Sequence, residues 1–196
     1  MRQKALIAAW VLPGAITAIA TIMMLFGDDA VLALRYERAA IGSGEFLRLL
    51  AGHAVHLGVE HFVMNVAGLA LVWYLVGSAY SASQWLVIIA SSIAVMDLGF
   101  WVLMPELDWY VGLSGLLHGM LAAGVAGIWR SRRPEAMIIL ALMILKLGYE
   151  ALIGPVPGSG DMAGGDVITA AHGLGAIGGI ISGTLFSIRV QPQGPI

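Results

Sequence analysis

The sequence predicts an all-α membrane protein, a single six-transmembrane-helix bundle that occupies residues 1–196. Of the 196 residues, 59% are hydrophobic and only 11% are charged, which is more apolar than the core of a soluble domain of this length requires. Crossing a hydrocarbon layer of roughly 30 Å takes about 20 apolar residues. The runs that meet this length are 5–26, 62–80, 85–104, 111–129, 136–153 and 167–188.

The first run is longer than the apolar region of a signal peptide, and no small-residue cleavage site stands before Asp28. We interpret it as a retained span. The third run contains Asp97, and the fifth contains Lys146 and Glu150, whereas the other four runs have no formal charge. We expect Lys146 and Glu150, which are four residues apart, to pair with each other or to be joined by Asp97.

Two connections are long, and the sequence shows no second domain and no repeat. Residues 27–60 include amphipathic stretches at 31–34 and 45–50, which we expect to lie along the membrane interface. Residues 154–166 are rich in glycine and proline, so we expect a mobile loop before the sixth span.

Positive residues predict the orientation, because Lys and Arg near the ends of spans stay on the cytoplasmic side. With the N-terminus inside, the opposite side holds only Arg35, Arg38 and Arg48. The cytoplasmic segments then hold Arg2, Lys4, Arg130, Arg132, Arg133 and Arg189. Both termini are therefore predicted to be cytoplasmic. A net charge of −2 gives no reason to expect a nucleic-acid partner.

This orientation places four polar residues at one depth. Spans two, four and six all run inward, so His61, Asn65, Ser114 and His172 lie in the outer leaflet. Polar side chains in a membrane are costly unless they bind each other or face water, so the cluster indicates a functional site.

Ser114 is the candidate nucleophile, because it lies near a helix start between two glycines, and His172 is the candidate base. Stripes of small residues allow close approach of the fourth and sixth spans. They are Gly115, Gly119, Ala123 and Gly127 on one span, and Gly175, Gly179 and Gly183 on the other.

His61 and Asn65 share one helical face and are candidate donors to an oxyanion. Each residue also has a simpler interpretation. A serine near a helix start is most often a cap, and His or Asn in a membrane helix often only joins helices. Those interpretations do not require all four residues to share a leaflet.

Together, the motifs His61-x-x-x-Asn65, Gly112-Leu-Ser-Gly115 and Ala171-His172 resemble the rhomboid intramembrane serine proteases, from Glu45 onward. The resemblance implies a catalytic dyad of Ser114 and His172 without a third acidic member, and an oxyanion site of His61 and Asn65. Two further segments resemble the rhomboid family: Arg48-Leu-Leu, and the end of the second span at Gly77. His53 and His56 would be structural residues of the first loop, with His56 the better match.

A narrower resemblance is to the rhombosortases, a bacterial branch of compact rhomboids. It rests on Gly112-Leu-Ser-Gly-Leu-Leu-His118-Gly119 and on Gly52-His53. It implies substrates with a C-terminal Gly-Gly motif, one transmembrane helix and a basic tail. His118 departs from common rhomboids. It could tune the dyad, bind a substrate group or bond to a neighbouring helix.

The resemblance implies acyl transfer on transmembrane protein substrates that enter laterally from the lipid bilayer. The enzyme would be a multi-pass protein of the bacterial inner membrane, with its active site toward the periplasm. We expect residues 154–166 and the fifth span to act as a gate, so that cross-linking the fifth span to the second abolishes cleavage.

Other classes of protein remain open. An inactive relative that binds transmembrane clients would be expected to have lost Ser114 or His172, and this chain has both. A metal or haem protein would need ligands that the five histidines do not readily supply, so we expect no metal and no cofactor. The pair of Lys146 and Glu150 could also suggest proton-coupled transport.

Overall fold

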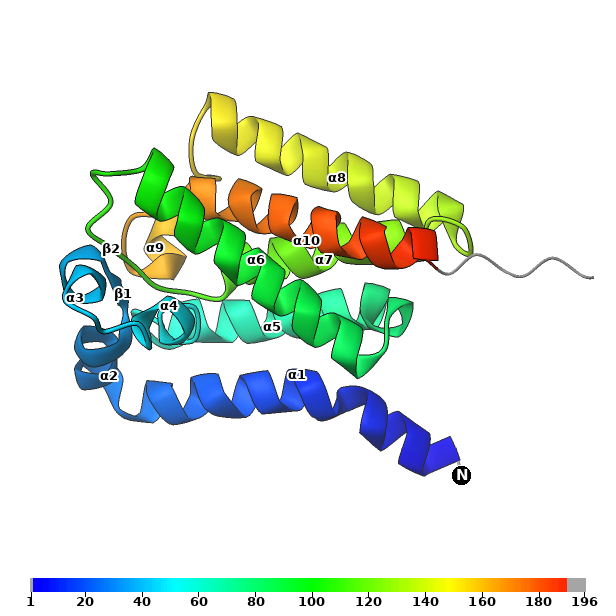
Figure 1. Cartoon of the computed structure of the whole chain (residues 1–196), viewed down its shortest axis with the longest axis horizontal. Helices are drawn as coiled ribbons and strands as arrows, with labels where there is room; N and C mark the ends of the chain where they lie inside the picture. The colour runs from blue at the N-terminus through cyan, green and yellow to red at the C-terminus, as the bar shows by residue number, and fades with distance from the viewer. Residues whose placement is uncertain (1, 190–196) are drawn as a thin grey trace, which may run out of the picture.

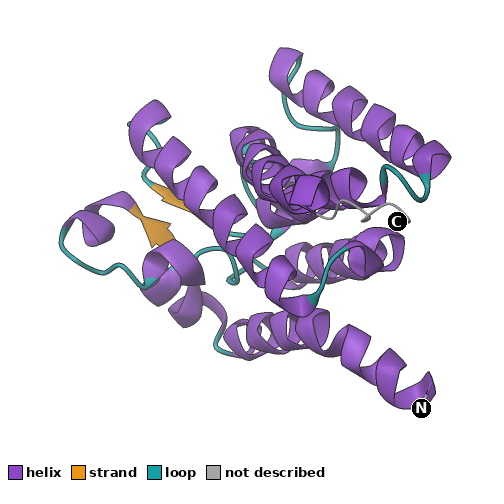
Figure 2. Ribbon diagram, turned by 45° about the vertical axis from the view of Figure 1, so that its right-hand side comes forward, coloured by secondary structure: helices purple, strands orange, loops and turns teal. Residues whose placement is uncertain are grey.

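The computed structural model describes residues 2–189, and the side chains of residues 10–188. It is a helical bundle with one two-stranded ribbon at one end (Figures 1 and 2). In chain order the elements are α1 (Arg2–Leu25), α2 (Gly27–Leu34), β1 (Tyr36–Glu37), α3 (Arg38–Gly42), α4 (Arg48–Ala51), α5 (Val59–Val76), the 3-10 helix η1 (Gly77–Ala79), α6 (Ala82–Leu103), β2 (Trp109–Tyr110), α7 (Ser114–Ile128), α8 (Arg133–Leu152), α9 (Ser159–Ala163) and α10 (Thr169–Arg189).

The long helices α1, α5, α6, α7, α8 and α10 lie at the predicted apolar runs. Three helical segments of the described chain are long and apolar enough to cross a membrane, at 59–79, 82–103 and 169–188. Residues 10–25 and 27–34 meet the same test together, but the chain bends by 110° between them. The apolar helix α7 has 15 residues and is shorter than a typical span. The composition of the described helices therefore supports three or four spans directly.

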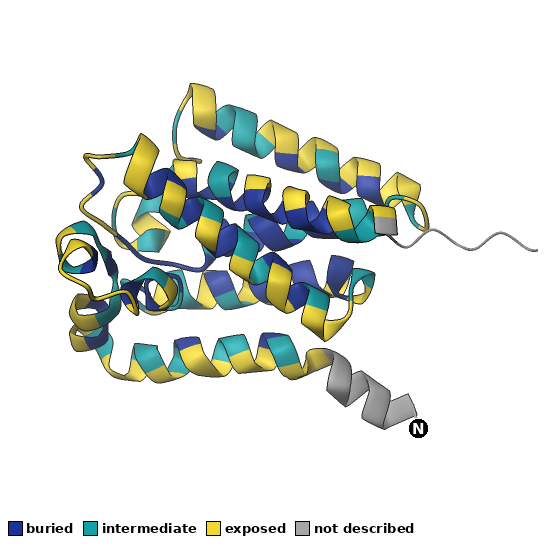
Figure 3. Cartoon of the chain, viewed as in Figure 1, coloured by how far each residue is buried: buried dark blue, intermediate teal, exposed yellow. Residues whose placement is uncertain are grey.

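Most residues of helix α7 are buried, and its main partner is α10; buried residues are dark blue in Figure 3. The predicted stripes of small residues meet there. A Cβ atom added to Gly175 would strike the backbone of Gly115, and one added to Gly179 would strike the backbone of Gly119. The two backbones are thus in direct contact, and their relative position is tightly determined.

The connection between α1 and α5, which holds the amphipathic stretches, is folded into short elements. It forms α2, β1, α3 and α4. Strand β1 pairs antiparallel with β2, with Tyr36 opposite Tyr110. This pairing ties the first connection to the segment that leads into α7. The ribbon lies at the left of Figure 1, opposite the end where α1 begins.

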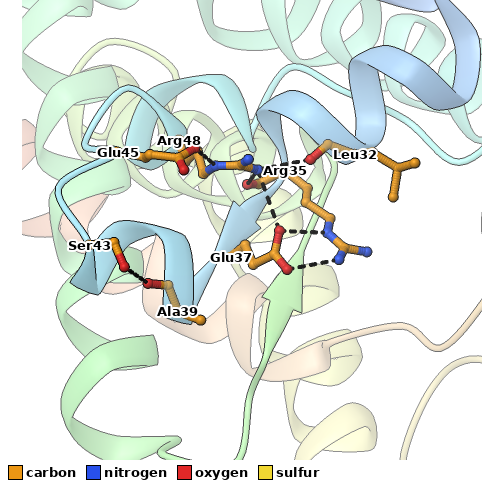
Figure 4. A network of polar contacts seen from close by, with 7 residues as sticks. All are labelled: Leu32, Arg35, Glu37, Ala39, Ser43, Glu45 and Arg48. Carbon is orange, nitrogen blue, oxygen red and sulfur yellow. Dashed lines mark hydrogen bonds and ion pairs between the residues drawn. The ribbon is translucent and has the colours of Figure 1, made fainter.

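Arg48 is the centre of a polar network in this connection (Figure 4). Its guanidinium donates to the carbonyls of Leu32 and Arg35 at 3.0 and 3.2 Å, and to Glu45 Oε2 at 2.7 Å. The hydrogen bond from Arg35 to Glu37 lowers the pKa of the Glu37 carboxyl. Arg48 therefore joins α2, α4 and the start of β1 into one unit, which supports the β1–β2 pairing.

The connection between α8 and α10 contains a short helix, α9. Glycines with left-handed backbone conformation lie on both sides of it, at Gly158 and Gly164, with φ of 80° and 70°. Gly164 and Gly165 face Leu57, just before α5. This segment, which we expect to be mobile, lies beside the residues just before α5.

Candidate active site

The turn before Ser114 requires glycine at position 112 and is held by hydrogen bonds to its main chain. Gly112 has a φ of +115°, and a Cβ atom there would lie 2.8 Å from Nε2 of His61. The buried hydroxyl of Tyr110 donates to the carbonyl of Gly112 at 2.9 Å, and the N–H of Gly112 donates to the carbonyl of Gly52 at 3.1 Å. Helix α7 then begins at Ser114. The hydroxyl of Ser114 is thus placed by a well-supported turn.

Ser114 and His172 are in hydrogen-bond contact. The Oγ atom of Ser114 lies 2.9 Å from Nε2 of His172, although the two residues are 58 positions apart. His172 is in the first turn of α10 and is buried. The close approach of α10 to Gly115, described above, makes this short distance possible.

The other ring nitrogen of His172 faces a carboxylate. Nδ1 donates to Oε2 of Glu150 at 2.9 Å, and Oε1 of the same carboxylate accepts from Nζ of Lys146 at 2.8 Å. The predicted pairing of Lys146 with Glu150 is therefore confirmed. The resemblance implied a catalytic dyad without a third acidic member, whereas the structure places the Glu150 carboxylate against His172.

Asp97 does not join that pair. Its Oδ1 lies 3.1 Å from Nε2 of the buried His53, which ties α6 to the segment before α5. The suggestion that Asp97 joins Lys146 and Glu150 was therefore wrong. The direction in which Asp97 points is set by packing of α6, and its position in the sequence does not reveal it.

His118 lies directly beside the catalytic candidates. Its ring stacks on that of His172, with centroids 4.3 Å apart and an interplanar angle of 22°. Its Nδ1 donates to the carbonyl of Ser114 at 2.7 Å, within the same helix. The bond to a neighbouring helix that the sequence suggested is replaced by this local bond. His118 thus limits the movement of the His172 ring on one face.

His61 and Asn65 face the same cavity from α5. Asn65 is buried, and its Nδ2 donates to the carbonyl of His61 at 3.1 Å. The ring of His56 packs edge-on against that of His61, with centroids 5.0 Å apart. Burial, and secondarily the nearby His61, lowers the pKa of His56 to about 4, so its ring is neutral at physiological pH. His56 therefore contacts the candidate oxyanion site through an uncharged ring.

A cavity of about 450 Å³ brings these residues together. Much of its wall is apolar, and it reaches from α5 across the β2 segment to α8, α9 and α10. Its polar lining residues include Ser114, His172, His61, Asn65, His118, Lys146 and Glu150. A hydroxyl bonded to an imidazole, opposite possible donors to an oxygen, is an arrangement suited to acyl transfer.

Comparison with known proteins identifies the family of the chain. Residues 43–189 match the Rhomboid domain. The chain belongs to the rhomboid family. The family resemblance of the predicted motifs is confirmed over nearly the stretch where it was expected, and the chain is a multi-pass membrane protein.

One relative of this rhomboid is the Rhomboid protease GluP of Bacillus subtilis (strain 168). The two are 27% identical over 145 residues, which is 70% of this chain. The aligned part is only 28% of the length of GluP. The comparison thus concerns the rhomboid domain, and it leaves the narrower rhombosortase branch without support.

Sequence reasoning missed two contributors to the site of this rhomboid. For Glu150 the sequence suggested a pair with Lys146 or a part in proton-coupled transport, and not the contact with His172. A carboxylate in an apolar helix is itself a signal of function. Tyr110 lies outside the expected motifs, and nothing in its surroundings in the sequence marks it. Its role depends on the pairing of β1 with β2, which brings its hydroxyl to the turn before Ser114.

Proposed function

We propose that this rhomboid is a serine endopeptidase that cleaves single-span membrane proteins, with Ser114 as the nucleophile and His172 as the base. The distance of 2.9 Å between Ser114 Oγ and His172 Nε2 is the observation that carries the proposal. It is supported by the position of both groups on a cavity large enough for a peptide segment.

The reaction follows from this pair. Ser114 Oγ attacks the peptide carbonyl carbon while its proton passes to Nε2 of His172. When the tetrahedral intermediate collapses, the C–N bond breaks and His172 returns the proton to the leaving amine. A water molecule then attacks the acyl-enzyme, His172 takes the water proton, and Ser114 is released with its proton restored. The products are an amine and a carboxylic acid.

His61 and Asn65 would stabilise the oxyanion of the intermediates. Both line the cavity that contains Ser114. The Asn65 side chain uses one N–H for the carbonyl of His61, which leaves its second N–H for a substrate oxygen. Such donors act mainly on the transition state, because negative charge on that oxygen develops there.

The substrate class is proposed to be that of the rhombosortases. A transmembrane helix with a preceding Gly-Gly would unwind readily, so that its backbone could enter the apolar cavity beside α5, α8 and α9. We further propose six crossings of the inner membrane. The distribution of Lys and Arg supports an orientation with both termini in the cytoplasm and the site toward the periplasm.

A fluorophosphonate probe tests the activated serine. Purified protein in detergent should be labelled as Ser114 Oγ displaces fluoride from phosphorus, and both Ser114→Ala and His172→Ala should abolish labelling. Ser182→Ala is the matched control, because this buried serine bonds only carbonyls of its own helix in the described structure. A folded native chain that is not labelled would contradict the proposal and favour a client-binding rhomboid.

A reporter substrate tests whether the protein has the substrate specificity of the rhombosortase branch. We expect cleavage of a reporter that carries Gly-Gly, one transmembrane helix and a basic tail, and little cleavage when Gly-Gly is replaced by Leu-Leu. Equal cleavage of both reporters would retain the protease and reject the rhombosortase specificity.

The chain has no cysteine, which allows a clean test of the gate. A Cβ atom built at Gly164 lies 3.5 Å from Cβ of Leu57, within the range for a disulfide. Cysteine at Gly164 is strained by its φ of +70°, so the reduced variant Leu57→Cys/Gly164→Cys must itself cleave the reporter and serves as the reference. Oxidation should then block reporter cleavage, and reduction should restore it. Unchanged cleavage after complete oxidation would show that movement of α9 away from α5 is not required.

A further inference from the structure

Glu150 occupies a position that is unfavourable for a carboxylate. It lies in the last turn of α8, where the helix dipole disfavours negative charge. Its side chain is only 3% exposed, whereas that of Lys146, one turn further from the helix end, is 36% exposed. The residue nearer the end of the helix is thus the buried one, and its side chain points into the bundle.

The ion pair with Lys146 does not explain this burial. A pair that served only the stability of α8 could remain at the surface, and the order Lys before Glu at a spacing of four is the weaker one. Burying a carboxylate is costly unless its oxygens are well bonded. Here one oxygen binds Lys146 and the other binds Nδ1 of His172.

We propose that Glu150 is a positioning residue for His172, so that this rhomboid uses Ser114, His172 and Glu150 as a triad. The inference rests on the proposed serine-protease function. The hydrogen bonds of Glu150 in the described structure go to Lys146 and His172, so it acts through the imidazole. The Ser–His pair thus has the acidic partner that the family resemblance did not imply.

The bond to Glu150 selects the working tautomer of His172. A carboxylate accepts hydrogen bonds only, so the hydrogen of the neutral ring must be on Nδ1. Nε2 then carries a lone pair and can accept the proton of Ser114. When the ring becomes positively charged during the reaction, the adjacent carboxylate stabilises that charge without taking the proton.

Lys146 makes this selection necessary. Its Nζ lies 3.3 Å from Nδ1 of His172. Without the carboxylate, the ammonium would donate to Nδ1 and the ring hydrogen would move to Nε2, where it would prevent the ring from accepting the serine proton. Glu150 prevents this by accepting a hydrogen bond from the Lys146 ammonium with one oxygen and from His172 Nδ1 with the other. Lys146 in turn offsets the negative charge of Glu150, which otherwise would be buried alone.

The rate of fluorophosphonate labelling tests the positioning role. Glu150→Gln keeps the size of the side chain but removes its charge, and we expect labelling about 10²- to 10⁴-fold slower, by analogy with loss of the acidic member of other triads. Glu150→Asp should recover part of the rate. Glu135→Gln is the matched control, because it makes the same change at an exposed position of α8. Labelling of Glu150→Gln within about threefold of the native rate would overturn the inference.

The tautomer of His172 gives a second measurement that a purely structural role would not change. In protein labelled with ¹⁵N-histidine, with the His172 signals assigned by their loss in His172→Ala, we expect the native ring to carry its hydrogen on Nδ1. In Glu150→Gln it should move to Nε2. A native ring with its hydrogen on Nε2 would overturn the inference even if Glu150→Gln failed to fold.

The two proposals fail in different ways. If the native chain is not labelled, the serine-protease function fails, and the tautomer measurement still reports whether Glu150 controls His172. If the native chain is labelled and Glu150→Gln is labelled equally fast, the protease stands and the triad is rejected.

Discussion

The two ends of the α7–α10 pair use the same kind of bond for different purposes. At one end, the hydroxyl of Ser114 meets the ring of His172 at 2.9 Å. At the other, the hydroxyl of Tyr80 lies 2.9 Å from the carbonyls of Ala123 and Gly183, and 3.1 Å from Oγ of Ser187. Each hydroxyl joins the same two helices across the glycine contact.

The partners of each hydroxyl explain the difference. Backbone carbonyls accept hydrogen bonds but cannot take a proton, so Tyr80 can only hold the helices together. An imidazole can take a proton, and at the Ser114 end its second nitrogen is bound to the carboxylate of Glu150. The two ends thus differ in their acceptor: at the Ser114 end the acceptor is a base, and that base is itself bound by a carboxylate.

The largest expected effect comes from the contact between the two ends. A Cβ atom at Gly179 would strike the backbone of Gly119, which cannot move aside. We expect Gly179→Val to lower the free energy of unfolding by at least about 3 kcal/mol and to disturb both ends together. Thermal unfolding and probe labelling would show this. Gly148→Ala, at a helical site with open space, is the control and should be neutral or stabilising.

At the Ser114 end, Asn65→Ala should slow reporter cleavage by about 100- to 1000-fold, because it removes one proposed donor to the oxyanion. The midpoint of thermal unfolding should change little, because the bond lost lies within a single helix. Steady-state kinetics with the reporter would measure the effect, and it should be in kcat. A variant that changes only KM would show that Asn65 binds substrate and does not stabilise the transition state.

The Ser114 end should also be sensitive to acid through His56. Its pKa is lowered to about 4 by burial, so below the ordinary histidine value the unfolded chain binds a proton that the folded chain does not. The free energy of unfolding is therefore unaffected by His56 above pH 6.5. It falls as the pH drops from 6.5 toward 4, by about 3 kcal/mol in total. Thermal unfolding at several pH values would measure the loss.

His56→Phe should reduce that acid dependence, whatever its effect on stability at neutral pH. The quantity to compare between the native chain and the variant is the slope of the free energy of unfolding against pH, from pH 6.5 to 4.5. An unchanged slope would mean that other groups account for the acid sensitivity.

The smallest effect is expected at the other end. Tyr80→Phe removes the hydroxyl that contacts the carbonyls of Ala123 and Gly183. It should lower the free energy of unfolding by about 1 to 2 kcal/mol. The labelling rate of the folded fraction should stay within about twofold of the native value. A large fall in that rate would show that the two ends are coupled through α7 and α10.

Much of the site could be predicted because its signals are local. Ser114 between glycines, the spacing of His61 and Asn65, and the stripes of small residues are properties of short segments. The family could be inferred from the same motifs, and the match over residues 43–189 confirmed it. The fold of residues 27–58 was less accessible, because its short elements depend on the distant pairing of Tyr36 with Tyr110.

By itself, the sequence determined the apolar helices, the family and the residues that could carry the chemistry, because hydropathy and motif spacing operate within single segments. The tertiary structure alone decided which polar side chains meet. It paired Asp97 with His53, stacked His118 on His172, and turned Glu150 toward His172. The physical reason is that a side chain's partner depends on the rotation and crossing of whole helices, and in this bundle direct backbone contact at the glycines sets both.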